Sequence, residues 1–432
     1  MSGLTLFVLF FALLLAGVPI AAAMGLSAAV VIMLMGADMP WWGLFTLQQS
    51  FDSGIAKYPL LALPMFVLVG SAFDRSGVAE RMITFATAVL GRGPGKLPLV
   101  VILVAMLLGG ISGSGAALAA AIGGVMIGAM RRAGYPPAFS ATVIGSATAT
   151  DVLIPPSLAF VIYSILVTGV SLPELFVAGV VPGVLAGVAL MVPAWLLSRR
   201  HRFGQVEAQL PRPPFWKSLR EAAWGLVTPV VILGGMRAGW FTPTEAAVVA
   251  AAWILMVGMF VHRTIGLRDL LDIFAESART SAVIMVVLGF AAAFAYCIDT
   301  LGIAHHIVNA LSDLDLGRLT ALLLVLVVLK LVGMFLDGVS VFMIFVPILA
   351  PMVKFFGWDP VWFAVLFTMV VALGQFTPPL AVNLLVACRF AQVPIEKTIP
   401  WIGWFFLSFV IAIALVIAVP DLALWLPRVA GY

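Results

Sequence analysis

Long apolar runs separated by short polar stretches make up most of this chain, and two of the runs are broken near the middle. Residues 97–131 are interrupted by Gly109-Gly-Ile-Ser-Gly-Ser-Gly115, and residues 138–170 by Thr148-Ala-Thr-Asp-Val-Leu-Ile-Pro-Pro-Ser157. Each half is too short to cross a bilayer, which takes about 20 apolar residues. The pattern therefore predicts a re-entrant hairpin over 97–131 and a broken helix over 138–170.

Basic residues on both sides of the first broken run support the hairpin. Arg92 and Lys96 precede it, and Arg131 and Arg132 follow it. If both pairs face the cytoplasm, as basic loops usually do, the chain between them enters the membrane and turns back. A re-entrant hairpin followed by a broken helix is typical of transporters, where irregular backbone lines a cavity.

The same pattern occurs a second time, shifted by about 223 residues. Gly115 recurs as Gly338, and the pair Pro155-Pro156 recurs as Pro378-Pro379. Because these positions coincide in order, we expect an internal duplication. The predicted parts are a first repeat over 1–198 with an arm at 38–57, a cytoplasmic linker over 199–225, and a second repeat over 226–432 with an arm at 266–280, a hairpin at 319–354 and a broken helix at 361–389.

The two repeats are predicted to be inverted. Each contains about five full crossings and one hairpin, and an odd number of crossings makes the second copy enter from the opposite side. The charges agree, because the loop before the first hairpin is basic, whereas Arg318 is the only Lys or Arg in its counterpart, 299–318. The expected fold is an all-α polytopic membrane protein with both termini in the periplasm.

Composition narrows the class further. The 432 residues are 63% hydrophobic and only 10% charged, whereas soluble domains carry about 25% charged residues. The small net charge of +4 does not indicate a nucleic-acid partner, because the basic residues lie in loops between apolar runs. No phosphate-binding loop, zinc-protease motif or paired nucleophile and histidine occurs, so we expect neither an enzyme nor a resident cofactor.

Chemistry is expected at the four breaks, Ser112–Gly115, Thr148–Ser157, Leu336–Ser340 and Gly374–Pro379. Free carbonyls at half-helix ends, together with hydroxyls, suit Na⁺, and free amides suit a carboxylate. The predicted cation-binding residues are Ser112, Gly113, Ser114, Thr150, Asp151, Pro155, Asp337, Gly338, Ser340, Gly374, Thr377 and Pro378. The predicted substrate-binding residues are Ser114, Ser157, Gln375, Asn383 and Arg389.

Three charged residues have two interpretations each. Asp337 either pairs with Lys330, seven residues earlier and two helical turns away, or serves in cation or proton coupling. Asp151 either completes a cation site or caps the half-helix that is expected to start near Pro155. Arg389 either meets a substrate carboxylate or extends to the cytoplasmic interface.

Several motifs resemble a known family along nearly the whole chain. They are Gly239-Trp-Phe-Thr-Pro-Thr-Glu-Ala-Ala247, Leu153-Ile-Pro-Pro-Ser157, Phe335-Leu-Asp-Gly338 and Phe376-Thr-Pro-Pro379 followed by Asn383-Leu384. The chain resembles the large membrane subunit, DctM type, of tripartite ATP-independent periplasmic (TRAP) transporters. In this comparison Thr150-Asp151 stands where a small apolar or glycine pair is expected.

The resemblance implies a secondary transporter of the bacterial inner membrane that works by an elevator motion. Hairpins and broken helices would form the moving transport domain, and the other helices and arms the scaffold. A Na⁺ gradient would drive uptake of an organic acid, which a periplasmic binding protein (DctP type) delivers, and a small membrane subunit (DctQ type) would brace the large one. The alternative is a Na⁺/carboxylate symporter or exchanger of the ion-transporter superfamily that needs no binding protein.

Overall fold

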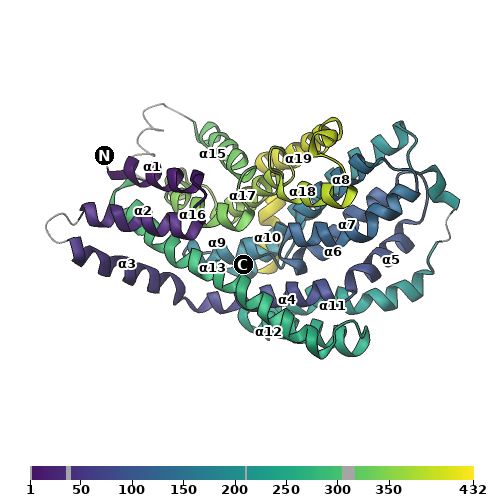
Figure 1. The fold of residues 1–432 in the computed structure, drawn as a ribbon, viewed down its shortest axis with the longest axis horizontal. Helices are drawn as coiled ribbons and strands as arrows, with labels where there is room; N and C mark the ends of the chain where they lie inside the picture. Colours follow the sequence, from purple (N-terminus) through teal and green to yellow (C-terminus); the bar gives the residue numbers. More distant parts are fainter. Residues whose placement is uncertain (1, 36–39, 210–211, 304–316) are drawn as a thin grey trace.

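The computed structural model describes residues 2–35, 40–209, 212–303 and 317–432 (Figure 1). Within these ranges all regular secondary structure is helical, which confirms the predicted all-α class. Six helices are long and apolar enough to cross a membrane, and several further apolar helices are shorter. The six are Leu172–Arg200, Phe215–Arg237, Pro243–Val261, Leu267–Thr300, Gly338–Phe355 and Ile395–Ala418.

The first half of the chain contains a helix that the sequence analysis treated as polar loop. This helix, α5, buries Val78, Met82, Ile83 and Ala86, a spacing that forms one apolar face of an amphipathic helix. The helices up to the linker are α1 (Ser2–Leu15), α2 (Ile20–Met35), α3 (Pro40–Ile55), η1 (Tyr58–Leu61), α4 (Ala62–Arg75), α5 (Val78–Leu90), α6 (Lys96–Ser112), α7 (Gly115–Arg132), α8 (Pro137–Thr148), η2 (Ala149–Val152), α9 (Leu158–Leu166), α10 (Leu172–Arg200) and η3 (Gln205–Gln209).

The second half differs from expectation at three helices. α11 begins at Phe215, inside the predicted linker. The predicted arm 266–280 is the first part of the continuous helix α13, and a short helix, α20, follows α19. Residues 304–316 of the predicted acidic loop lie outside the described residues. The helices are α11 (Phe215–Arg237), α12 (Pro243–Met256), η4 (Val257–Val261), α13 (Leu267–Thr300), α15 (Arg318–Gly333), α16 (Gly338–Phe355), α17 (Pro360–Gln375), α18 (Val382–Ala391), η5 (Ile395–Thr398), α19 (Ile399–Ala418) and α20 (Asp421–Ala430).

Helices from the two halves pack against each other reciprocally. α4 packs on α12, while α13 packs on α2 and α3 (Figure 1). Each hairpin also contacts the broken helix of the other half: α7 contacts α18, and α16 contacts α9. Since α9 and α18 are the second halves of the two broken helices, this packing brings both hairpin turns and both breaks to one region of the molecule.

Two glycines allow the backbones near the breaks to approach closely. A Cβ atom at Gly110 of α6 would lie 2.5 Å from the carbonyl oxygen of Pro155 in the first break. A Cβ atom at Gly374 of α17 would lie 2.5 Å from the carbonyl carbon of Gly333 in α15. Both distances are below van der Waals contact, so these helix pairs pack with no room for a side chain.

A buried polar contact fixes the linker to the first hairpin outside the membrane-spanning helices. The Tyr135 hydroxyl donates to the Glu207 carboxylate at 2.8 Å and accepts from the backbone amide of Gly95 at 2.9 Å. Glu207 belongs to η3, and Gly95 immediately precedes α6. Burial raises the pKa of Glu207 above its usual value, although the hydrogen bond from Tyr135 opposes the rise.

Candidate functional site

A cavity of about 300 Å³ lies where the hairpin turns and helix breaks meet. Both hairpin turns, both breaks and one face of α13 contribute to its wall. We call it the central cavity. Half of the predicted site residues line it, namely Gly113, Ser114, Asp151, Asp337, Gly338, Ser340, Gln375 and Asn383.

The first hairpin turn is held by local backbone geometry. Gly113 follows α6 with a φ of 66°, a left-handed conformation that glycine adopts without strain. Ser114 then caps α7, because its side chain accepts a hydrogen bond from the amide of Ala117 at 3.4 Å. The Ser112 hydroxyl is buried and donates to the carbonyl of Ser114, also at 3.4 Å. The turn therefore presents Gly113 and Ser114 to the central cavity.

Asp337 caps the N-terminus of α16 at the second hairpin turn. Its carboxylate accepts from the backbone amide of Ser340 at 3.2 Å and from the Ser340 hydroxyl. The predicted Lys330–Asp337 ion pair is wrong, because the Lys330 ammonium contacts the sulfur of Met334 at 3.0 Å and lies 5.4 Å from the ring centre of Phe406. Asp337 has no ion-pair partner in the described ranges.

Asp151 is the least satisfied polar group of the first break. Its side chain lines the central cavity, the residue is 2% exposed, and Oδ1 has no hydrogen-bond partner in the part of the chain that the structure describes. The alternative that Asp151 caps the following half-helix is wrong, because α9 begins at Leu158 and no side chain caps it. The Thr150 hydroxyl donates to the carbonyl of Ala147 in α8, and the Ser157 hydroxyl donates to the carbonyl of Val152 within the break.

The second break presents an amide pair to the cavity. Asn383 Nδ2 donates to Gln375 Oε1 at 3.1 Å, and both residues are buried. The Thr377 hydroxyl instead donates to the carbonyl of Leu373, and Arg389 is exposed in the last turn of α18. The predicted residues outside the cavity lining are Ser112, Thr150, Pro155, Ser157, Gly374, Thr377, Pro378 and Arg389.

The cavity combines two kinds of electrostatic group. Its charged lining residues are Asp151 and Asp337, and its lining contains no Lys, Arg or His. The first residues of three helices, Gly115 of α7, Gly338 of α16 and Val382 of α18, also line it. Helix N-termini carry free amides and a partial positive charge. The cavity therefore offers carboxylate and hydroxyl oxygens to a cation, and backbone amides to an anion.

The α13 wall was not predicted from the sequence. Thr280, Val283, Ile284 and Val287 contribute it, and their spacing of three to four residues places them on one face of the helix. Three of the four are apolar, so no chemical pattern marks them in the sequence. Only the contact of α13 with the hairpin helix α16 shows that α13 lies beside the hairpin turns and breaks.

The sequence matches a known transporter family over most of its length. Residues 7–422 match the family model described as the DctM component of tripartite ATP-independent periplasmic transporters. The chain is 34% identical to the C4-dicarboxylate TRAP transporter large permease DctM of Rhodobacter capsulatus, over the full length of both chains. It is 31% identical to the sialic acid TRAP transporter large permease SiaM of Vibrio cholerae, over 97% of each chain.

Two further comparisons concern a longer relative and a solved structure. Over 90% of its length the chain is 37% identical to the isethionate TRAP transporter permease DctMQ of Oleidesulfovibrio alaskensis, and it spans 60% of that protein. The crystal structure of the Alcanivorax borkumensis YdaH transporter has the same fold, with a TM-score of 0.67 at 15% identity over 94% of this chain and 100% of that one.

These comparisons decide the class of the protein. The relatives are transporter permeases, which confirms that the chain is not an enzyme, and the apolar helices make it a multi-pass membrane protein. This chain belongs to the DctM family, the large permease component of tripartite ATP-independent periplasmic transporters.

Proposed function

We propose that this chain imports an organic acid across the bacterial inner membrane. A cation gradient drives the import, and the proposed cation is Na⁺. The central cavity carries the proposal, because it places two carboxylates and three helix N-termini at the meeting point of both hairpins and both breaks. A soluble periplasmic binding protein delivers the substrate, and a small DctQ-type membrane subunit completes the complex.

The cation sites are proposed around the carboxylates. Asp337 with the Ser340 hydroxyl forms one oxygen cluster, and Asp151 with its unpartnered Oδ1 forms another. A buried carboxylate in the membrane needs a partner or a cation, because burying an isolated charge is costly. Hard oxygen ligands of this kind suit Na⁺.

The same charges explain how the cation and the substrate are coupled. An organic anion that enters the empty cavity meets two carboxyl side chains and no basic one, and an ionised carboxylate there opposes its binding at short range. Bound Na⁺ cancels that repulsion, after which the amides at the three helix N-termini hold the carboxylate. Substrate binding then requires prior cation binding, and this order prevents the substrate from crossing without the cation.

The movement is proposed to be of the elevator type. The hairpins and broken helices pack together as one group and would carry the site, while α13, together with α2, α3 and α4, would stay in the membrane as scaffold. The reciprocal packing of α7 with α18 and of α16 with α9 supports the inverted duplication. The basic residues before the first hairpin and in the linker support the proposal that both termini lie in the periplasm.

The substrate class is proposed from the named relatives. C4-dicarboxylates, isethionate and sialic acid are all small organic anions, and the three helix N-termini of the central cavity suit such an anion.

Uptake by the reconstituted complex tests the proposal. The large and small subunits are placed in liposomes with the cognate binding protein, and labelled succinate, isethionate and sialic acid serve as first probes. A screen of ligands on the binding protein replaces these probes if none binds. We expect uptake to need an inward Na⁺ gradient and to stop when a sodium ionophore removes it.

Two outcomes would contradict parts of the proposal. Uptake that persists after both the Na⁺ and the proton gradients have been collapsed would exclude gradient coupling. Uptake at full rate without the binding protein would favour the independent symporter or exchanger instead, and would leave the cation coupling in place. A proton ionophore alone is the matched control, because it removes the proton gradient and leaves the Na⁺ gradient.

A further inference from the structure

A second cavity adjoins the central cavity along α13. It has a volume of about 470 Å³ and is lined by Arg75, Asp272, Ala275, Glu276, Arg279 and Thr280. Thr280 also lines the central cavity, so the two spaces meet at this residue. We call the second space the outer cavity. Its lining is polar or charged, apart from Ala275, whereas the α13 wall of the central cavity beyond Thr280 is Val and Ile.

Both cavities open along one face of the same helix. Asp272, Glu276, Thr280 and Ile284 follow one another at intervals of four residues in α13, which places them one above the other on the helix surface. From Glu276 to Ile284 the helix rises by roughly 12 Å. A small solute that moves along this face therefore passes from the central cavity to the outer cavity within about two helical turns.

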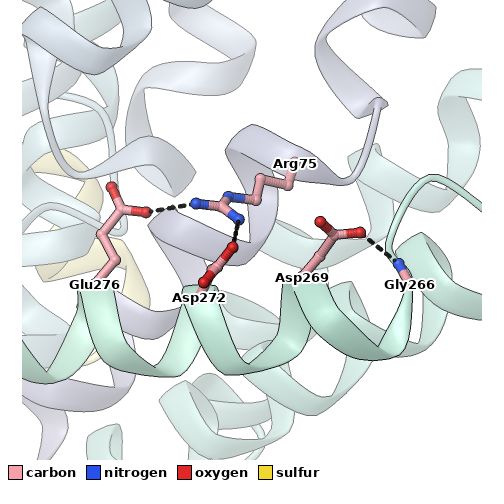
Figure 2. Close-up of polar contacts among 5 residues, drawn as sticks. All are labelled: Arg75, Gly266, Asp269, Asp272 and Glu276. Atoms are coloured by element: carbon pink, nitrogen blue, oxygen red, sulfur yellow. Dashed lines mark hydrogen bonds and ion pairs between the residues drawn. The ribbon is translucent and has the colours of Figure 1, made fainter.

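Some charged side chains of the outer cavity form ion pairs, and others do not. Arg75, at the end of α4, reaches α13 and forms ion pairs with Asp272 at 3.6 Å and Glu276 at 3.2 Å (Figure 2). Asp269, one turn earlier, accepts from the backbone amide of Gly266 at 2.8 Å (Figure 2). Arg279 is exposed and forms no ion pair with any described residue. The one unneutralised cation of this cavity thus lies next to Thr280.

We propose that the outer cavity is the cytoplasmic exit of the transport site, in which a departing organic anion passes Thr280 and then meets Arg279. The proposal rests on the function and orientation proposed above, and adds the route and its residues. Arg279 favours the anion outside the central cavity, and as an exposed cation in water it binds only weakly, so the anion is not trapped. Arg75 is already paired and holds the wall of the exit in place.

Cysteine labelling tests this route without any transport measurement. In the complete complex, Cys297 and Cys388 are first replaced by alanine, and single cysteines are introduced as Thr280→Cys, Val283→Cys and Val286→Cys. The probe is the negatively charged, membrane-impermeant thiol reagent MTSES, applied to inside-out or right-side-out vesicles. Val286 is the matched control, because it is 42% exposed against 64% for Val283, yet it lines neither cavity.

We expect Thr280→Cys and Val283→Cys to react from the cytoplasmic side at least about tenfold faster than Val286→Cys, because only a thiol that water reaches ionises and reacts. Arg279→Gln is expected to slow the reaction of MTSES at Thr280→Cys about threefold and to accelerate that of the cationic reagent MTSET. Arg268→Gln, which removes an exposed cation of α13 that lines neither cavity, should change neither rate.

Three results would overturn the proposal. Equal rates at Val283→Cys and Val286→Cys would show that water does not continue from Thr280 into the central cavity. Faster labelling from the periplasmic side would place the exit on the wrong face. Equal effects of Arg279→Gln and Arg268→Gln would remove the role of Arg279. Labelling needs no gradient and no substrate. These results can therefore be distinguished from a failure of Na⁺-driven uptake.

Discussion

Asp337 combines a structural and an electrostatic contribution, and two substitutions separate them. Asp337→Asn keeps an oxygen that accepts from the Ser340 amide but removes the charge. We expect it to retain the melting temperature of the complex in detergent and to lose most Na⁺-dependent uptake. Asp337→Ala removes the cap as well and should cost about 1 kcal/mol of stability. Normal Na⁺ dependence in Asp337→Asn would show that the carboxylate acts only as a cap.

Lys330 is expected to be independent of Asp337. The helix that carries Lys330 ends at Gly333, and Asp337 is the N-cap residue of the next helix, so the two-turn spacing that suggested a pair does not apply across the turn. Lys330→Met should therefore have a small effect, and its effect on uptake should add to that of Asp337→Asn. A double variant that performs better than Lys330→Met alone would indicate a coupled pair.

Glu207 gives the linker a pH-dependent contact. Burial raises its pKa, so the folded protein holds its proton more tightly than the unfolded chain does. This contribution to stability is complete below the usual glutamate pKa, and it decreases as the pH rises through the raised value. We expect Glu207→Gln to reduce the fall in melting temperature as the pH rises above the usual glutamate pKa of about 4. An unchanged pH dependence in Glu207→Gln would contradict this assignment.

At the scale of the helices, the sequence predicts where a helix is interrupted better than it predicts where a helix continues. Gly and Pro mark the hairpin turns and breaks directly, because they permit the backbone conformations that end a helix. α13 was divided in two because its first part is polar and its second part apolar, yet no proline lies between Leu267 and Thr300. The helix therefore continues from the polar interface into the membrane. α5 is hard to recognise in the sequence because its charged residues mask the spacing of its buried apolar positions.

Close packing of helices at the breaks is expected to be sensitive to a single methyl group. Gly110→Ala and Gly374→Ala each place a Cβ atom 2.5 Å from backbone atoms of a neighbouring segment, so we expect a loss of about 1–3 kcal/mol. Gly403→Ala in α19 is the matched control, because a Cβ atom there meets nothing within 4 Å. The thermal stability of the three purified variants measures the difference. Equal melting temperatures would contradict the close approach.

For the whole molecule, the sequence predicts the class and part of the site. The breaks locate Asp151, Asp337, Gln375 and Asn383, all of which line the central cavity. The sequence does not locate the α13 wall of the central cavity, because that wall depends on contacts between distant segments and consists mostly of apolar residues, which carry no chemical signature. It also assigns hydroxyls such as that of Thr377 to the site, although local carbonyls accept their hydrogen bonds.

Binding of radioactive sodium to the purified complex tests the central claim most directly, since it requires neither substrate nor gradient. We expect saturable binding that unlabelled NaCl displaces and choline chloride does not. Asp337→Asn should reduce this binding strongly, whereas Lys330→Met should leave it unchanged. The absence of saturable sodium binding in the unmodified complex, or equal binding in Asp337→Asn, would contradict the account of the central cavity as the cation-coupled transport site.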